Sequence, residues 1–469
     1  MATENVGYQP LNAADKKNAR LITIEPIICF FMLGDGIYYG LQSEFIQGRI
    51  ADVHNYTLPN NNDENGTCSL NASSPENKLQ ADIEAEASNW VMYITIAYTL
   101  PSVFMTLVLG SWSDSVGRKP AILITSVGTL LNLISWTIVA ALNLPLEILI
   151  ASEMLRGMSG GTSLLTAACF TYISDVTTTE NRTTRIIACE FVFLVSLSCG
   201  QFSGGFLVDQ FSFEIAYSVA LSFTFISIIY TTIPYLLRET IVAKIRFKES
   251  IKKQLVGISA IWTEKDLEYK KTFVVISVVF FIATVFTSVM ALLTLHFLAE
   301  PFCFSYLMVS YYTAALALAS TIGKNNSGRK TLAAISIIIF SGLLLSVVLL
   351  KRWLNDYWLI HLSMLSAILF NMVSSVAKTT TIAFVGKSLN PVNTLLQYYA
   401  VAERLNLRLI QITLIAGAVF GFFGLVNSLG GFISPLVLNN IYSATVHTMP
   451  TFVFWMCGSF SLIPIISVW

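Results

Sequence analysis

Long apolar runs separated by short polar stretches follow one another along almost the whole chain. Crossing ~30 Å of hydrocarbon takes roughly 20 helical residues, and about twelve runs reach that size. Backbone groups inside a bilayer must be satisfied within their own segment, so each run is predicted to be a helix. The alternating ten-residue segments of a membrane barrel are missing. The predicted helices cover residues 21–45, 89–110, 120–142, 146–173, 186–208, 214–237, 272–298, 304–323, 331–351, 357–385, 409–437 and 449–469.

A polar segment at 238–271, rich in lysine and arginine, divides these runs into two sets of six. We interpret it as a cytoplasmic linker between an N-terminal half, 21–237, and a C-terminal half, 272–469, with a polar tail at 1–20. Two six-helix halves joined in this way are typical of secondary transporters. The alternative for the linker is a solvated basic loop beside anionic lipid. Residues 386–411 fit the pattern least and are predicted to form a polar loop leading into a short amphipathic helix.

Composition places the chain among integral membrane proteins. Charged residues make up 12% of it, whereas they make up about a quarter of a soluble chain. A formal net charge of zero gives no electrostatic basis for binding nucleic acid. Seven cysteines in 469 residues do not indicate a disulfide scaffold. The polar start lacks the apolar core of a signal peptide, so the first run is predicted to be a spanning helix.

Lysine and arginine in the short loops predict the orientation in the membrane. With the N-terminus in the cytoplasm, the basic linker and the basic loop before residue 120 also fall inside. Both termini are then cytoplasmic, and the 46–88 loop lies outside. This hydrophilic loop carries a cluster of N-glycosylation sequons, which agrees with the charge rule. The predicted glycosylation sites are Asn55, Asn65 and Asn71.

A short charged turn, Gly-Ser-Trp-Ser-Asp-Ser-Val-Gly-Arg-Lys-Pro at 110–120, separates the second and third runs and makes them antiparallel neighbours. Its spacing resembles the signature loop of the major facilitator superfamily. The fuller string, with 172–177 and 424–430, resembles solute carrier family 46, the group of the proton-coupled folate transporter. In the superfamily this loop bridges the two halves and so acts in gating. The gating residues implied here are Gly110, Asp114, Gly117, Arg118 and Lys119.

The resemblance implies a major facilitator fold and secondary active transport by alternating access. The implied activity is proton-coupled symport of a small organic, folate-like anion, driven by the proton gradient without a cofactor. We expect the plasma membrane as its location, with the endolysosomal membrane as the alternative. No cluster has metal-ligand spacing and no Ser-His-Asp arrangement stands out, so neither a metal site nor enzymatic activity is expected.

Ionisable residues within the bilayer cost roughly 2.5–3.5 kcal/mol on insertion scales and are functional hypotheses by default. Glu190 matches the glutamate that couples protons in the family; the alternative is a structural hydrogen bond or a partner for a basic residue. Lys378 stands where the family has an arginine implicated in substrate binding. Lysine keeps the positive charge but loses the planar fork that suits a carboxylate. Its alternative is a lysine that snorkels to the interface.

Four further residues are candidates for the transport cavity. Glu153 and Arg156 are spaced i, i+3 and can pair on one helix face, as a structural pair or as substrate or gate contacts. Asp35 lies between two glycines that permit close helix approach, and either a cavity-facing or a structural role fits it. His296, near the outer end of the seventh run, is either a pH-sensitive gate residue or an interface histidine with its hydrogen bonds satisfied.

The resemblance also implies an outer disulfide between Cys68 and Cys303, on the side where oxidation is permitted. Two departures concern the substrate: Phe286 stands where the folate transporter has a histidine, and Gly161 where it has an aspartate. These losses weaken folate as the solute. They also favour a second hypothesis, a membrane receptor or scaffold that has a carrier fold but does not transport.

Overall fold

The computed structural model describes residues 23–56, 75–177, 179–233, 237, 239, 267–298, 302, 304, 306–314, 356–377, 382 and 416–460. These residues form an all-helical bundle, and no strand occurs among them. The helices are α2 (Glu25–Val53), α3 (Pro75–Val116), α4 (Arg118–Leu142), α5 (Glu147–Met158), α6 (Gly161–Val176), α7 (Thr179–Gln210), α8 (Phe213–Thr232), α10 (Leu267–Leu298), α11 (Tyr306–Ala314), α13 (Asp356–Val376), α16 (Ala416–Thr445) and α17 (Phe452–Phe460).

Four stretches in the described part are long and apolar enough to cross a membrane: Lys78–Ser113, Arg118–Leu142, Phe191–Gln210 and Phe213–Thr232. Most predicted runs coincide with helices, but the end of the first helix and the start of the second differ from the predicted positions. α2 continues to Val53 and α3 already begins at Pro75, so the hydrophilic loop is shorter than predicted. The ninth run, 331–351, and the polar stretch 386–411 lie outside the described residues.

The fourth run was predicted as one helix, and this prediction is wrong. The chain breaks between α5 and α6 because Gly160 and Gly161 adopt positive φ angles of 87° and 56°. This left-handed region is readily open only to glycine. A Cβ at Gly161 would also lie 2.2 Å from the hydroxyl oxygen of Tyr98 on α3. The break brings α6 into contact with α3 and allows Thr162 to turn toward α2.

α2 and α7 pack closely through small residues. Gly36 and Gly40 on α2 face Gly200 and Gly204 on α7, and each pair is spaced i, i+4. A Cβ at Gly36 would lie 2.3 Å from the carbonyl oxygen of Leu197, and one at Gly200 would lie 2.4 Å from that of Leu33. Such small-xxx-small faces let helix backbones approach where the surrounding lipid is as apolar as the side chains.

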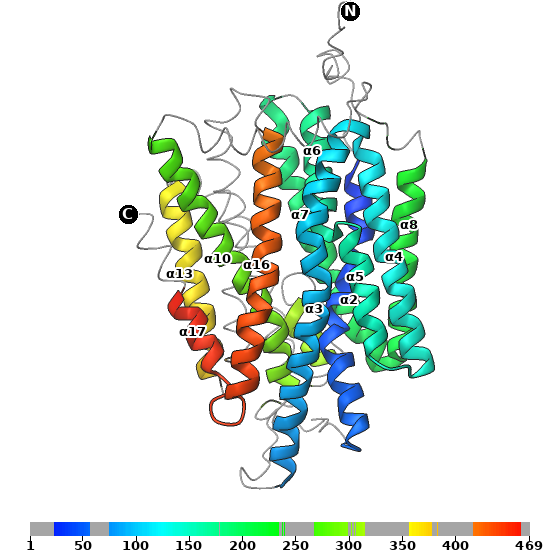
Figure 1. The fold of residues 1–469 in the computed structure, drawn as a ribbon, viewed down its shortest axis with the longest axis vertical. Helices are drawn as coiled ribbons and strands as arrows, with labels where there is room; N and C mark the ends of the chain where they lie inside the picture. The colour runs from blue at the N-terminus through cyan, green and yellow to red at the C-terminus, as the bar shows by residue number, and fades with distance from the viewer. Residues whose placement is uncertain are drawn as a thin grey trace, which may run out of the picture.

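The bundle has two ends that we name by residues at them (Figure 1). The Gly117 end carries the turn between α3 and α4. The Asn55 end, at the bottom of Figure 1, carries the start of α3 and the turn between α16 and α17. We call residues up to 239 the N-half and residues from 267 the C-half. α3 and α16 lie side by side along the boundary between the halves.

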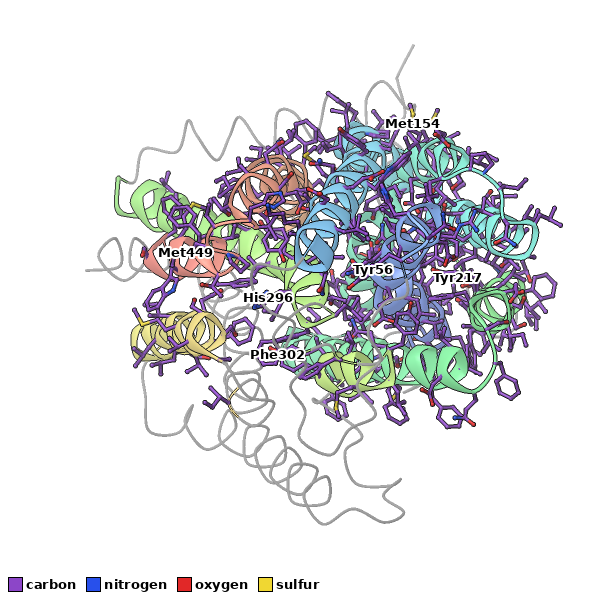
Figure 2. The ribbon with its side chains drawn as sticks, turned by 90° about the horizontal axis from the view of Figure 1, so that it is seen from below. Tyr56, Met154, Tyr217, His296, Phe302 and Met449 are labelled. Carbon is purple, nitrogen blue, oxygen red and sulfur yellow. The ribbon has the colours of Figure 1, made fainter. Side chains whose placement is uncertain are left out.

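The described apolar core differs between the two ends. One buried cluster combines α2, α3, α4, α5 and α8 of the N-half with α10, α11, α13, α16 and α17 of the C-half. Its members on α2 and α3 belong to the parts of these helices nearer the Asn55 end. The other cluster lies toward the Gly117 end and draws on α2, α4, α6, α7 and Leu237, all of the N-half. Figure 2, viewed from the Asn55 end, shows Tyr217 in the N-half and His296 and Phe302 in the C-half.

Polar contacts between the halves also lie at the Asn55 end. They join α3 to α16 and to the turn that follows α16. We give the name seam to the places at this end where the halves meet: α3 against α16 and the following turn, and α2 and α8 against Tyr306 of α11. Its polar contacts are Tyr442 Oη to Glu84 Oε2 at 3.1 Å, Ser88 Oγ to the Asn439 carbonyl at 3.4 Å, Asn440 Nδ2 to Met92 Sδ at 3.3 Å, and His447 Nε2 to Asp82 Oδ1 at 3.7 Å.

The glycine face between α2 and α7 gives a stability prediction. Gly200→Ala places a methyl group against the backbone of α2, and overpacking of this kind costs about 1–3 kcal/mol. We therefore expect a lower thermal unfolding midpoint for the purified variant in detergent. Gly431→Ala is the matched control, because its Cβ would meet only ordinary contact with Thr99 at 3.5 Å. Equal midpoints for the two variants would contradict the close approach of α2 and α7.

Candidate functional site

A buried ion pair joins α2 to α5 in the middle of the N-half. The guanidinium of Arg156 donates to Asp35 Oδ1 at 2.5 Å. Thr162, the second residue of α6, donates its hydroxyl to the other oxygen of Asp35 at 3.1 Å. Arg156 and Asp35 are each exposed by only 1% of their side chains. The buried carboxyl group of Asp35 is therefore met by one cation and one hydroxyl donor.

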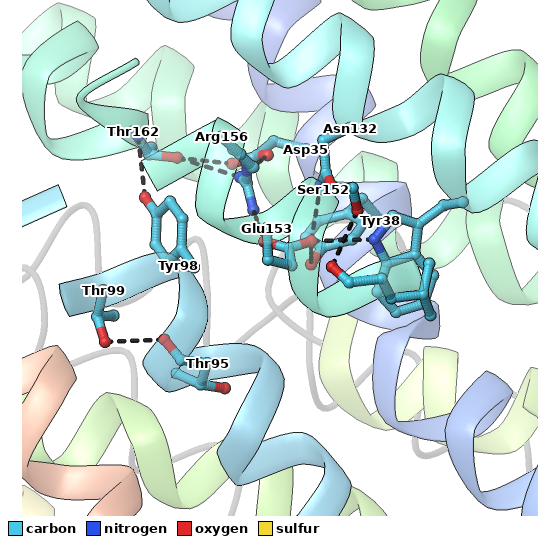
Figure 3. Close-up of polar contacts among 12 residues, drawn as sticks. Asp35, Tyr38, Thr95, Tyr98, Thr99, Asn132, Ser152, Glu153, Arg156 and Thr162 are labelled. Carbon is cyan, nitrogen blue, oxygen red and sulfur yellow. Dashed lines mark hydrogen bonds and ion pairs between the residues drawn. The ribbon is translucent and has the colours of Figure 1, made fainter. Parts of the chain in front are cut away.

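Glu153 lies one turn before Arg156 and faces it, as the i, i+3 spacing predicts. The nearest guanidinium nitrogen is 3.7 Å from Glu153 Oε2. Its other oxygen accepts three hydrogen bonds from α2 and α4 (Figure 3). The donors are Tyr38 Oη at 2.6 Å, Asn132 Nδ2 at 2.7 Å and Trp136 Nε1 at 3.0 Å. Three donors thus converge on one oxygen, and they fix the position of the Glu153 carboxyl group between α2, α4 and α5.

Aromatic rings surround the guanidinium of Arg156. Its central carbon lies 4.7 Å from the ring centroids of Tyr38 and Tyr98 and 5.1 Å from that of Tyr39. These are cation–π distances. Tyr39 is 38% exposed, so one face of this cage borders the accessible surface. Two nitrogens of Arg156, Nε and Nη1, lack a hydrogen-bond acceptor among the described residues. The guanidinium therefore keeps donor capacity for another anion.

We refer to these residues together as the Arg156 cluster. Its titratable groups are two carboxyl groups and one guanidinium, all buried, so it holds one negative charge in excess whenever both carboxyl groups are ionised. A buried charge that is not paired costs several kcal/mol. Binding one proton, or exchanging partners around Arg156, would change that balance. The cluster comprises Asp35, Tyr38, Tyr98, Asn132, Trp136, Glu153, Arg156 and Thr162.

The predicted gating loop lies at the Gly117 end of the bundle. Gly110 and Asp114 belong to the last two turns of α3. Gly117 has a φ of 133°, and a Cβ there would lie 2.3 Å from the carboxyl group of Glu239. That carboxyl group accepts hydrogen bonds from the backbone nitrogens of Arg118 at 2.9 Å and Lys119 at 3.2 Å. Arg118 also pairs with Asp175 of α6 at 3.4 Å. The loop is thus tied to the start of the linker and to α6.

His296 lies near the end of α10 and is 2% exposed. Its ring contacts those of Phe297, Phe302 and Phe454, with centroids 5.7–6.1 Å apart. Its Nδ1 lacks a hydrogen-bond partner among the described residues. The structure therefore places His296 in the aromatic core of the C-half, apart from the Arg156 cluster.

Several predicted residues lie at positions where side chains are not described. Glu190 lies in α7, Asp114 in α3 and Phe286 in α10, but only their backbones are described. Asn55 is exposed in the turn after α2. Lys378, Asn65, Asn71, Cys68 and Cys303 lie outside the described residues.

The pairing of Glu153 with Arg156 follows from the sequence, but the three hydrogen-bond donors to Glu153 do not. Tyr38, Asn132 and Trp136 are single polar positions in apolar helices, and nothing in a sequence tells which carboxylate such groups will meet. Asn132 alone carried a readable signal, because a buried amide in a membrane helix must find a partner.

Comparisons with known proteins agree with the fold. The family model described as Major Facilitator Superfamily matches residues 63–407. Two solved structures share the architecture at low sequence identity. The human organic anion transporter MFSD10 (TETRAN) superposes with a TM-score of 0.60 at 14% identity, covering 95% of this chain and 99% of that one. The nucleoside transporter NupG gives 0.55 at 11% identity, covering 95% and 98%.

Two curated relatives are similar over most of their length. The lysosomal proton-coupled steroid conjugate and bile acid symporter SLC46A3 of Gallus gallus is 25% identical over 462 residues, covering 95% of this chain and 93% of the relative. The proton-coupled folate transporter of Bos taurus is 26% identical over 404 residues, covering 85% and 82%. With the helical bundle and the family match over residues 63–407, these findings establish that the chain belongs to the Major Facilitator Superfamily and is a membrane transporter, not an enzyme.

Proposed function

We propose that the chain is a proton-coupled symporter for a small organic anion, built from twelve spanning helices with both termini in the cytoplasm. The observation that carries this proposal is the Arg156 cluster, with its buried guanidinium between two carboxylates. A carrier needs such a group where a proton and an anion can each alter the charge balance. The similarity to proton-coupled symporters for folate and for steroid conjugates and bile acids supports the same class of solute.

The coupling follows from the charges of the cluster. An anion that binds to Arg156 must replace Asp35 as its partner, and an ionised Asp35 would then repel it. A proton on Asp35 removes that repulsion and releases the guanidinium. Proton and anion therefore favour each other's binding, and the coupling is reciprocal. Tyr39 and Tyr98 would hold the freed guanidinium through their ring faces.

The orientation proposed from the charge rule puts the Gly117 end in the cytoplasm and the Asn55 end outside. Asn55, Asn65 and Asn71 would then be open to glycosylation, and Cys68 and Cys303 would face an oxidising side. The described polar contacts between the halves lie at the Asn55 end. This arrangement corresponds to a carrier closed toward the outside, one of the two states of alternating access. The plasma membrane is the proposed location, with the lysosomal membrane as the alternative.

Two further roles rest on the family resemblance. Glu190 on α7 would take up the proton from the outer side, and Lys378 would supply a second positive charge for the anion. The basic residues of the gating loop would break and reform ion pairs at the cytoplasmic end. Near the surface such pairs are worth about 0.2–1 kcal/mol each, which suits groups that switch between two states.

Uptake across a pH gradient tests the symport. Radiolabelled folate, a steroid sulfate and a bile acid are offered to proteoliposomes at about pH 5.5 or about pH 7.5 outside, with the inside at about pH 7.5. We expect at least one anion to accumulate only at the acidic pH, up to about 100-fold for one proton, since each pH unit corresponds to about 1.4 kcal/mol. Glu190→Gln should lose the acid stimulation. Equal uptake at both pH values, or full stimulation in Glu190→Gln, would refute the proton role.

The Arg156 cluster predicts an asymmetry between two neutralising variants. Asp35→Asn leaves one carboxylate with one guanidinium, so the protein should remain stable. Its anion affinity should no longer fall as the pH rises, while accumulation by the gradient is lost. Arg156→Gln leaves two buried carboxylates without a cation and should destabilise the protein by roughly 3–5 kcal/mol. Thermal unfolding in detergent and the KM for the transported anion measure both effects. Similar stability of the two variants would contradict the charge balance described here.

A substitution of Lys378 tests separately whether the solute carries a negative charge. Lys378→Ala should raise the KM for an anionic solute about tenfold or more, since a charged hydrogen bond is worth about 1.5–3 kcal/mol. Lys378→Arg keeps the charge and should retain transport. An unchanged KM in Lys378→Ala would remove this residue from the binding site.

A further inference from the structure

A second buried carboxyl group lies at the seam, outside the Arg156 cluster. Glu44 on α2 is 0% exposed. Neither of its carboxyl oxygens has a hydrogen-bond partner among the residues that the structure describes. Gln47, one turn further along the same face, is also 0% exposed, and both ends of its amide lack a partner there. Gln80 of α3 is also buried, and both ends of its amide lack a hydrogen-bond partner among the described residues.

Groups from both halves surround Glu44. Tyr217 of α8 interacts with it electrostatically, and the Tyr217 hydroxyl is buried without a described partner. Tyr306, the first residue of α11, interacts with it from the C-half. A Cβ at Gly48, one turn beyond Glu44, would lie 3.2 Å from the Tyr306 hydroxyl oxygen. Phe213 of α8 and Tyr306 stack edge to face at 5.5 Å.

The other charged groups near this site have partners of their own. Arg49 donates to Asn143 Oδ1 at 2.6 Å and to the carbonyls of Asn143 and Leu144 at 2.9 and 3.2 Å. Glu84 of α3 accepts from Tyr442. Asp52 lies two turns beyond Glu44 and interacts electrostatically with Tyr306. No cation in the described part of the chain offsets a charge on Glu44.

A carboxylate that is fully buried and meets neither a donor nor a cation among the described residues is too costly to persist in this position. The carboxyl group is therefore neutral while the halves are in contact at the Asn55 end. We infer that Glu44 is a proton-binding group of the seam, whose protonation closes the carrier toward the outside. This assignment rests on the proposed orientation. It adds a pH-dependent gate to the proposed symport, because Glu44 stays buried behind the closed seam and exchanges its proton with the outer side only.

The pH dependence has a definite sign. When the seam opens, water reaches Glu44 and the group can ionise, so the closed state holds one more proton than the open state. Closure is then favoured at acidic pH and weakens as the pH rises, by up to about tenfold in the closing equilibrium per pH unit. An acidic outer solution would thus start the inward step of the cycle. The amides of Gln47 and Gln80 are suited to hydrogen-bond a neutral acid.

Hydrogen–deuterium exchange of the purified protein in nanodiscs tests the inference without a solute. The peptides to follow are residues 44–55 of α2 and 438–446 of α16, on the two sides of the seam. Wild type and Glu44→Gln are compared at the same pD, about 5.5 and about 7.5, so that intrinsic exchange rates cancel. Glu44→Leu serves as a second variant that cannot ionise.

We expect equal protection of all three proteins at acidic pD. Near neutral pD the seam peptides of wild type should lose protection by up to about 100-fold over the two units, while both variants stay protected. Glu86→Gln is the control, since its carboxylate is exposed in a pair with His54 at the same end; it should behave like wild type.

Two results would overturn the inference: the same protection of wild type and both variants near neutral pD, or a loss of protection in both variants at acidic pD. Failure of the symport itself is recognised separately. In that case uptake is independent of pH while the difference in exchange between wild type and Glu44→Gln remains.

Discussion

The pairing of Arg156 with two carboxylates is the interaction on which the architecture of the N-half depends. An arginine at this depth is tolerated only if its charge is met, and Asp35 and Glu153 meet it from α2 and from its own helix. The broken fourth span is part of the same solution. The left-handed glycines at 160 and 161 end α5 and start α6 so that Thr162 reaches Asp35. α2 can present Asp35 beside α7 because glycines on both helices remove the side chains that would separate them.

Satisfying Arg156 does not make the cluster neutral. One of the two carboxyl groups exceeds the single guanidinium, and three donors hold Glu153 in place. Asp35 is the more adaptable partner of Arg156, because apart from the guanidinium only the Thr162 hydroxyl donates a hydrogen bond to it in the described structure. A static structural pair would be better served by a single carboxylate. The extra charge makes sense in a carrier that exchanges one anion for another during its cycle, and the tyrosine cage keeps the guanidinium in place while it does so.

Much of this arrangement was predictable from the sequence, and the exceptions have physical causes. Runs of apolar residues locate helices because lipid imposes the same rule on every segment. The i, i+3 pairing of Glu153 and Arg156 follows from helix geometry alone. Asp35 as the second partner does not, because a contact over 121 positions depends on how α2 packs. Glu44 is the last but one residue of the first predicted run, 21–45, where a carboxylate is expected at the membrane surface, whereas α2 continues to Val53 and buries it. Polar residues there face protein, and hydropathy cannot distinguish a side chain turned toward protein from one turned toward water.

The two buried carboxyl sites of α2 suggest how one helix can serve both chemistry and movement. Asp35 has a cation, so its charge state is set by what binds to Arg156. Glu44 has none in the described structure, so its charge state is set by whether the halves meet. The two groups lie nine residues, or about two and a half helical turns, apart on a helix packed against α7 and α8. Asp35 responds to the solute, and Glu44 responds to the closing of the gate. A proton that neutralises either group lowers the cost of burying it. An acidic outer solution therefore favours both the loading of the site and the closing of the outer end, and these are the two steps that a proton gradient must drive in the same direction.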